Sequence, residues 1–466
     1  MKEHREKSHF GRPRAGIWGR AFMIFSLACM LSVVQCPTGQ AQDTLFLNME
    51  TILEEGGAQN LVIEHYRRAQ QKAEADFTRA KEWWWPEVYG GMQGHKLWGT
   101  AMNADGGFFL DVNRGNLWSG LGLKVDWDFG EGIYQARAAR LERKAQSYQT
   151  QAKRNHILLE TIEAYYDLLS AQLLEKAYAG MVRQSDTLVR QLEVQVEAGM
   201  RYPSEMLLSK SSRNHLNIQR IKARKDFQKA QARLGRLLNT DPEVVLIGTD
   251  SLLTNVELVP KEQWQKNASQ EVYQERPEYE YEKTRMDALQ TERKKTTEGL
   301  WWPHLQVGTN PGYFGGLFQQ VQPMEPAAEP NPRSVYPTTG INASLMWRLP
   351  LGRIISQGRL KQYDARVALQ ENAIERLQNK VTDEVRRAQA ELYAADEQLA
   401  LARESQEMAQ KAVNQSIQRQ KQGTARPFEV FQAQEFYLEA RLDYLHAIAD
   451  YNQAQYRYYV ATGNDL

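Results

Sequence analysis

Apolar and small residues recur along two long stretches of the chain with the alternating four-and-three spacing of a heptad repeat. The first series is broken once, at Asn155, and contains Leu141, Ala145, Tyr148, Ala152, Leu159, Ile162, Tyr166, Leu169 and Leu173. The second contains Ile374, Leu377, Val381, Val385, Ala388, Leu392, Ala395, Leu399, Ala402, Ala409 and Val413. Heptad spacing is typical of helices that supercoil around neighbouring helices. We therefore predict two long helices, at about 132–198 and about 353–422, each a rod of roughly 100 Å.

Both rods end in the same kind of turn. Gly199 and Gly423 follow the last heptads, and Pro203 and Pro427 come four residues later. A glycine after a helix and a proline in the first turn of the next one are the expected punctuation. The returning helices are predicted at about 204–238 and about 428–462, each roughly half as long as its rod. Short helices at about 60–82 and 277–298 are expected to complete the other half.

Two shorter segments alternate between apolar and polar residues. In the first, Leu117, Ser119, Leu121, Leu123, Val125, Trp127 and Phe129 alternate with Gly120, Gly122, Lys124, Asp126 and Asp128. In the second, Ile341, Ala343, Leu345, Trp347 and Leu349 alternate with Asn342, Ser344, Met346 and Arg348. Alternation over about ten residues is typical of a strand that crosses a membrane with lipid on one side and water on the other. A half-buried soluble strand shows the same periodicity.

The tryptophans favour the membrane interpretation. Nine of the eleven lie in or beside the predicted strands, as an interfacial aromatic belt requires. We predict that the belt contains Trp84, Trp85, Trp98, Trp118, Trp127, Trp301, Trp302 and Trp347. Partner strands follow Pro86 and Pro303, which places the four strands at about 86–98, 117–129, 303–310 and 339–350. The two hairpin tips are expected at 95–116, which is rich in Gly and Asn, and at 311–337, which holds six prolines.

The chain repeats this arrangement. Trp84-Trp85-Pro86 returns as Trp301-Trp302-Pro303, and both turns after the rods carry a Gly-x-x-x-Pro pattern. We predict a first repeat at 42–250 and a second at 251–466, each with one strand hairpin. Four strands cannot close a transmembrane barrel, because the smallest barrels have about eight and open edges in lipid are costly. Insertion into a membrane therefore requires several copies of the chain.

The first 41 residues are expected to be a signal peptide. A basic stretch precedes the apolar run 21–34, and Gly39 and Ala41 place small residues at a cleavage site. An uncleaved anchor is the alternative, although about 14 apolar residues fall short of a membrane span. Both cysteines, Cys29 and Cys36, lie in this leader. Cys36 is an alternative lipid acceptor, but Gln35 stands where a small residue is required.

Composition favours long solvated helices, because mean hydropathy is -0.62 and 25% of the residues are charged. The net charge of +1, with basic and acidic residues interleaved, does not support nucleic-acid binding. The histidines after the leader are scattered without metal-ligand spacing, and no nucleophile, base and acid stand together. We therefore predict no enzyme activity, cofactor or metal. Asp126 and Asp128 are candidates for a cation path, although water-facing strand residues explain them as well.

The leader, the duplicated strand and rod units, the two Gly-x-x-x-Pro turns and the motif Glu275-Arg276-Pro277-Glu278-Tyr279 together resemble the TolC-type outer-membrane efflux protein family. The resemblance covers essentially the whole chain after the leader. It implies a mainly α protein with a membrane β-barrel portion, in which three chains form a 12-stranded barrel continuous with a periplasmic α-helical barrel. It also implies a passive outer-membrane channel of a tripartite efflux or type I secretion system. The implied partners are two further copies, outer-membrane lipid, a periplasmic adaptor and an inner-membrane pump of RND or ABC type.

In this family the turns at the periplasmic tips receive the adaptor. The matching positions here are Ala198, Gly199, Met200 and Arg201 in the first half, and Gln422, Gly423, Thr424, Ala425 and Arg426 in the second. The family usually has a basic residue directly after Gly-Thr, whereas this chain has Ala425 there and Arg426 one place later. Glu429 matches an acidic constriction position, and Gln432 replaces the next acid. An ordinary first-turn carboxylate is the alternative interpretation of Glu429.

A structural periplasmic coiled-coil protein with peripheral membrane contact is the competing function. Within the channel interpretation the cargo stays open, among drugs, metal ions, a secreted protein and cell-surface products.

Overall fold

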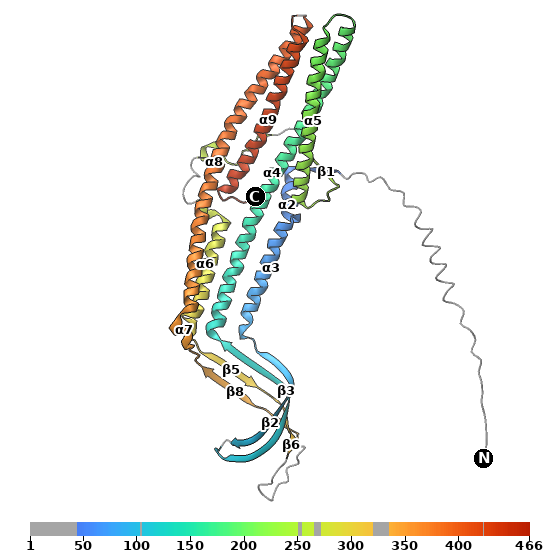
Figure 1. The fold of residues 1–466 in the computed structure, drawn as a ribbon. Coiled ribbons are helices and arrows are strands. Elements are labelled where there is room, and N and C mark those ends of the chain that lie inside the picture. Colours follow the sequence, from blue (N-terminus) through green and yellow to red (C-terminus); the bar gives the residue numbers. More distant parts are fainter. Residues whose placement is uncertain (1–43, 103–104, 250–253, 265–271, 320–334, 423) are drawn as a thin grey trace, which may run out of the picture.

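The computed structural model describes residues 44–102, 105–249, 254–264, 272–319, 335–422 and 424–466. The predicted leader with both cysteines, Gly423 and most of the proline-rich tip lie outside these residues. The described chain is elongated (Figure 1). A curled sheet forms one end, and two helical hairpins reach the other end, with both of their turns side by side.

The helices follow the predicted order. In the first half they are α2 (Met49–Gln59), α3 (Leu61–Lys81), α4 (Phe129–Glu197) and α5 (Pro203–Leu238). In the second half they are α6 (Pro277–Thr296), α7 (Leu351–Ser356), α8 (Gly358–Lys421) and α9 (Pro427–Ala461). The second rod differs from the prediction at its start. Gln357 adopts a left-handed conformation, with φ 49°, and this separates the short α7 from α8.

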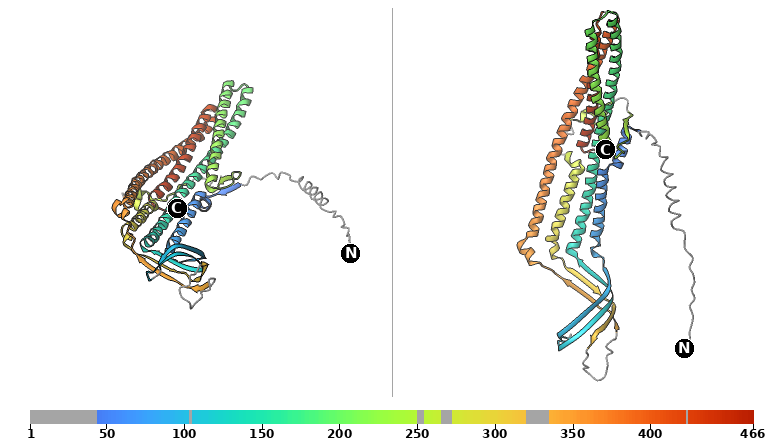
Figure 2. Two further views of the ribbon diagram at one scale, coloured as in Figure 1. Left: turned by 60° about the horizontal axis from the view of Figure 1, so that its bottom comes forward. Right: turned by 45° about the vertical axis from the view of Figure 1, so that its right-hand side comes forward.

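Two half-length helices pack along each long helix. Helices α3 and α5 both pack on α4, and α6 and α9 both pack on α8. Because α4 also contacts α6 and α9, the rods form one continuous wall (Figure 2). In the half of the wall that carries the tips, α4 and α5 form one hairpin and α8 and α9 form the other. Residues of α4, α5 and α9 meet between the two hairpins.

The heptad positions form the seams of this wall. Ala145, Ala152, Ile162 and Leu169 of α4 are buried, as are the α8 residues Val381, Val385, Ala388, Leu392, Ala395, Leu399 and Val413. The break at Asn155 has a physical reason. Its side chain is buried and donates to Asp465 Oδ1 over 2.6 Å, so a polar residue fastens the chain's C-terminal residues to α4.

The sheet at the end of the rods contains β2 (Glu87–Met102), β3 (Phe108–Asp128), β5 (His304–Thr309), β6 (Gly312–Gln319), β7 (Val335–Thr338) and β8 (Ile341–Met346). All neighbouring pairs are antiparallel. Strands β5 and β6 pair with consecutive parts of β3 in the same register. Strand β8 pairs with β5, and β7 pairs with β6, also in one shared register. Asn310 and Pro311 separate β5 from β6, and Gly340 lies between β7 and β8, so the six strands form four rows.

The strand bounds correct the prediction in both hairpins. Residues 95–116, expected as a tip, are largely paired, with His95 opposite Asn116 and the ladder continuing to Met102 and Phe108. Four glycines, at positions 90, 91, 94 and 99, hide the alternation of β2. In the second hairpin the last strand ends at Met346, so Trp347 and Leu349 follow the strand instead of belonging to it.

A compact core at mid-length was not predicted. Strand β1 (Thr44–Leu47) pairs in parallel with β4 (Val245–Gly248), and both lie against α4. The Gln172 side chain accepts a hydrogen bond from the Gly248 N–H and donates one to the Gly248 carbonyl, both over 3.1 Å. Trp264, 1% exposed, fills the second half of the same core. The two halves of the chain are joined here.

Candidate functional site

The strand registers separate the sheet into an apolar face and a polar face. Val125, Val307 and Ala343 lie side by side across three strands, on the face that also carries Leu123 and Leu345. Residues on the opposite pleat include Lys124, Asp126, Gln306, Asn342 and Ser344. The two alternating patterns thus line up into continuous faces. Leu121 and Leu345 of the apolar face are exposed in the single chain, whereas Val125 is buried.

The polar face carries a charged network near the helices. His304 Nε2 contacts Asp126 Oδ1, and His304 Nδ1 lies 3.8 Å from Asp128 Oδ2. Gln306 Nε2 donates to Asp126 Oδ2 over 3.2 Å, and Lys124 Nζ lies 4.0 Å from the same oxygen. The two carboxylates that were considered as candidates for a cation path are therefore both engaged with neighbours on this face.

The predicted aromatic residues gather mainly where the sheet meets the helices. Trp84, Trp85, Trp301, Trp302 and Trp347 are exposed at this junction. Trp127 belongs to the same level, since its indole N–H donates to the Trp84 carbonyl over 2.7 Å. Trp98 is exposed farther out on β2.

Trp118 lies on the opposite face of the sheet from Trp127. It lies nine residues from Trp127 along β3, and no irregularity separates them in the pairing of β3 with β5 and β6. Successive side chains point to opposite faces of a strand, so Trp118 and Trp127 point to opposite sides. Trp118 pairs with Gln93 and Phe314 on the polar side and contacts the Tyr89 ring. The prediction missed this because it counted tryptophans near strands without assigning each to a face.

Glycines allow the close packing of the junction. A Cβ on Gly130 would lie 2.0 Å from the Gly299 carbonyl oxygen, and one on Gly132 would lie 2.2 Å from the Trp83 ring. Lys295 Nζ also lies 3.3 Å from Glu131 Oε1. The two repeats therefore contact each other backbone to backbone at the junction between the helices and the sheet.

The first tip turn has the geometry of a glycine-terminated helix. Gly199 has φ +70°, and the Met200 N–H donates to the Gln195 carbonyl over 2.9 Å. Ala198 is exposed at the same turn, and Arg201 lies 3.7 Å from Glu205. Met200 and Tyr202 expose 68% and 75% of their surface. This turn therefore exposes one apolar and one aromatic side chain at the end of the long helix.

The second tip turn is closed by side chains. Gln422 and Thr424 donate backbone hydrogen bonds to the last turn of α8, and the Thr424 hydroxyl donates to the Arg419 carbonyl over 3.0 Å. Ala425 is only 7% exposed, so it contributes little surface to a partner. Arg426 is exposed at the N-cap of α9.

Glu429 makes the contacts of a capping carboxylate. Its side chain accepts a hydrogen bond from the Arg426 N–H over 3.4 Å, and Arg419 Nη2 lies 3.8 Å from its other oxygen. These contacts match the alternative interpretation of an ordinary first-turn acid. A constriction role stays a prediction, because it requires the same side chain from other copies of the chain.

The structure brings the two predicted tips together. A groove of about 350 Å³ lies between the hairpins and is lined by Leu192, Glu205, Leu208 and Ser209 from the first and by Arg426, Phe428 and Glu429 from the second. The two turns are therefore parts of one surface, although 224 residues separate Gly199 from its counterpart.

No protein-family model matches the chain, and no curated protein matches it in sequence. Solved structures do match. The outer-membrane channel OprN superposes with a TM-score of 0.67 at 17% identity, over 89% of this chain and 90% of that one. The CmeC outer-membrane channel of Campylobacter jejuni gives 0.69 at 14%, over 89% and 85%. The open state of the MtrE outer-membrane channel of Neisseria gonorrhoeae gives 0.69 at 13%, over 89% of each chain.

The chain has the fold of these outer-membrane channels. The fold class predicted from the sequence, mainly helical with a strand portion, is confirmed. The three matched proteins are channels and not enzymes.

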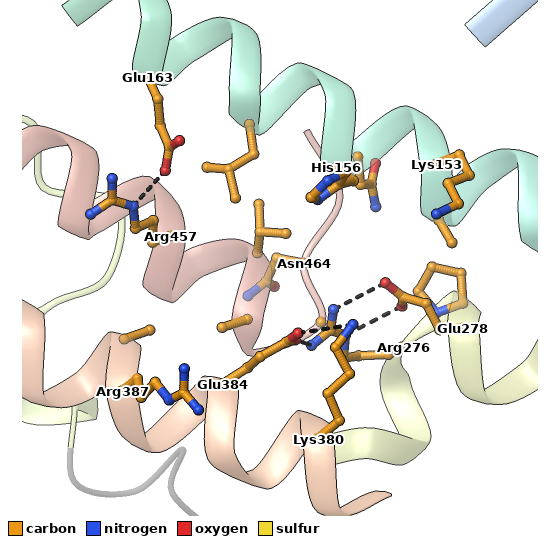
Figure 3. Close-up of a pocket in the computed structure, with 18 of the residues that line it drawn as sticks. Lys153, His156, Glu163, Arg276, Glu278, Lys380, Glu384, Arg387, Arg457 and Asn464 are labelled. Carbon is orange, nitrogen blue, oxygen red and sulfur yellow. Dashed lines mark hydrogen bonds and ion pairs between the residues drawn. The ribbon is translucent and has the colours of Figure 1, made fainter. Parts of the chain in front are cut away.

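A charged pocket lies at mid-length of this channel fold (Figure 3). The motif residue Arg276 binds Glu278 and Glu384 over 3.0 and 2.7 Å, and Arg457 lies between Glu163 and Glu391. Burial opposes the charged form of Arg276, but the two carboxylates hold its pKa above its ordinary value. The Glu275–Tyr279 motif thus joins the start of α6 to α8, which gives this motif a structural role.

Within the described residues, no group of His, Cys, Asp and Glu could hold a metal ion. Within the same residues, no helix combines the length and the apolar composition that crossing a bilayer requires.

Proposed function

We propose that the protein is one subunit of a trimeric, passive export duct in the outer membrane of a Gram-negative bacterium. The observation that carries this proposal is the two-faced sheet with open edges at the end of the long rods. Strand β2 pairs only with β3, and β7 and β8 pair only with β6 and β5, among the described strands. The likeness to outer-membrane channels over nearly nine-tenths of the chain supports it.

Closure of the sheet requires further copies. An unpaired strand edge in hydrocarbon leaves backbone groups unsatisfied at several kcal/mol each, so each open edge needs another strand. A cyclic arrangement lets β2 of one copy pair with β7 and β8 of the next. Three copies of four strand rows make a 12-stranded barrel, with the apolar face against outer-membrane lipid and the polar face around water.

The helical wall is then the periplasmic part of the duct. Its tips lie farthest from the sheet (Figure 1), where an inner-membrane pump of RND or ABC type can reach them through a periplasmic adaptor. Exposed Met200 and Tyr202, and the groove with Arg426 and Phe428, are the surface that an adaptor would contact. The pump supplies the energy and selects the cargo, so the proposal assigns no cargo to this chain.

The test is fractionation followed by conductance. The purified protein should come from the outer-membrane fraction and produce stepwise ion currents in planar bilayers. A heat-denatured sample is the control. Extraction by high salt without detergent, together with no current, would support the structural coiled-coil alternative instead.

Adaptor docking has its own test. A photo-reactive residue at Met200 should trap a periplasmic adaptor in cells. The same residue at Leu369, which is 71% exposed but lies on α8 far from the tips, should not. Equal trapping at both positions would contradict docking at the tips.

A further inference from the structure

We propose that Tyr89, Trp118 and Phe314 form a stacking surface for the sugar rings of a neutral oligosaccharide on the polar face of the sheet. These three residues are called the aromatic row below. The inference rests on the proposed function, because it requires the polar face to surround the water-filled lumen of the duct. It goes beyond that function by giving the lumen a binding surface and a class of ligand.

The strand registers place the aromatic row on the face that carries charged and amide side chains. Tyr89 of β2 lies opposite Gly122, and Trp118 of β3 lies opposite Phe314 of β6. Trp118, Gly122 and Lys124 are even-numbered positions of β3, and alternate residues of a strand point to the same side. The ring centroids of Tyr89 and Trp118 are 6.2 Å apart. The row therefore crosses three neighbouring strands on the polar side.

Glycines let two of the rings lie against the backbone. A Cβ on Gly122 would lie 2.2 Å from the Tyr89 ring, and a Cβ on Gly312 would lie 2.8 Å from the Trp118 indole nitrogen. Any side chain at these two positions would push the rings off the sheet. Each of the two rings therefore has one face against the sheet and the other toward the lumen. Tyr89 is 43% exposed, and Phe314 is 44% exposed.

The packing of the sheet does not explain the indole of Trp118. Its Nε1 atom is buried and has no hydrogen-bond partner in the described part of the chain. A buried donor without a partner is unfavourable, and a phenyl ring would lie over the same glycines without that cost. What the indole adds is a larger flat surface. A larger flat surface strengthens stacking with a ligand.

The side chains next to the row form hydrogen bonds and bring little net charge. Gln93 lies opposite the indole, and Asn116, two residues farther along β3, lies opposite His95. On the side toward the helices the row is followed by Glu87 opposite Lys124, which are opposite charges on neighbouring strands. Amides both donate and accept hydrogen bonds, so they suit hydroxyl groups.

A sugar ring matches this combination of groups. The C–H groups of a pyranose form a flat apolar face that stacks on an aromatic ring, and its hydroxyls project sideways toward the amides. The row, Gln93 and Asn116 are uncharged, so they offer an ionic ligand no partner. Further copies of the chain would repeat the surface around the lumen, and one chain of sugars could contact several rows. These features favour a neutral oligosaccharide.

Block of the ion current tests the class of ligand. Maltohexaose, a neutral chain of glucose units, should interrupt the current through the protein in planar bilayers, and the interruptions should become more frequent with concentration. Polyethylene glycol of the same hydrodynamic size has no sugar rings and should not interrupt it. Equal block by the two polymers would overturn the stacking surface. Block by ethidium, a flat aromatic cation, without block by maltohexaose would overturn the sugar assignment.

Single substitutions test the residues. Trp118→Ala should weaken the block by maltohexaose about fivefold at unchanged unitary conductance, and Trp118→Phe should keep most of it. Trp98→Ala is the matched control, because Trp98 lies opposite Asn113 on the apolar face of the same hairpin and is 71% exposed. It should leave the block unchanged.

A further variant covers the case in which Trp118→Ala fails to assemble. Phe314→Ala removes the more exposed end of the row and should also weaken the block. A conducting channel that maltohexaose does not block, or equal block in the Phe314→Ala and Trp98→Ala variants, would overturn the stacking surface and leave the duct standing. The absence of any current would overturn both.

Discussion

Single residues determine where helices end and how distant segments are fastened together. The sequence identified residues that fix the local backbone conformation better than residues that bind a distant side chain. Gly199 and Pro203 were identifiable because a left-handed turn and a helix start restrict residue type locally. Asn155 appeared only as a broken heptad, because its partner Asp465 lies 310 residues away. The side of the strand on which Trp118 lies also required the register.

The Gly130–Gly299 contact should be the joint least tolerant of a side chain. Gly130→Ala would place a Cβ 2.0 Å from the Gly299 carbonyl oxygen, so the backbone must move, at a cost of about 1 to 3 kcal/mol. Gly180→Ala is the matched control, since its Cβ would meet nothing within 4 Å inside the same helix. It should stabilise α4 by about 0.5 to 1 kcal/mol. Thermal unfolding of the two variants checks this, and equal shifts would contradict the close contact.

Glu142 should make stability fall as pH rises. Desolvation between α4 and α6 raises the pKa of its carboxyl, Arg285 lowers it and Glu292 raises it further. The folded protein therefore holds this proton more tightly than the unfolded chain does. The resulting stabilisation is complete below the ordinary pKa and is lost as pH rises through the folded pKa. Glu142→Gln should raise the thermal midpoint at about pH 7 and leave it unchanged below about pH 4. Glu371→Gln on α8 is the control, and a gain only at low pH would contradict the assignment.

Elements with a long, regular period were predictable, and short or glycine-rich ones were not. The heptads of α4 and α8 extend over many turns, so their seams could be assigned residue by residue. Strand β2 holds four glycines in sixteen residues, and its alternation is hidden. Strands β1 and β4 have four residues each and are held by distant partners such as Gln172, which no local pattern reports.

The two faces of β8 should respond differently to the same charge. Ile341 is 75% exposed on the apolar face, and its chain neighbour Asn342 points to the polar face. Ile341→Arg should cost about 2 to 4 kcal/mol if this position lies near the bilayer midplane, whereas Asn342→Arg should cost little. The amount of assembled protein in outer-membrane fractions measures the difference. Equal losses would mean that the faces have been assigned to the wrong solvents.

At the scale of the whole molecule, the duplication predicted the architecture but not the site. Both repeats supply one hairpin of strands, one rod and one tip, and the sequence spacing was enough to place them in order. In the proposed trimer the channel belongs to no single chain. The strand edges and any ring formed by Glu429 would be completed by other copies, whose contacts leave no periodic signal in one sequence.

The mass of the detergent-solubilised protein tests the central claim most directly. Four rows of strand with two open edges should not persist as a monomer in a membrane, because each unpaired backbone group in hydrocarbon costs several kcal/mol. Light scattering, corrected for bound detergent, should give three times the mass of the mature chain. A monodisperse species with the mass of one chain, carrying an intact sheet, would contradict the account.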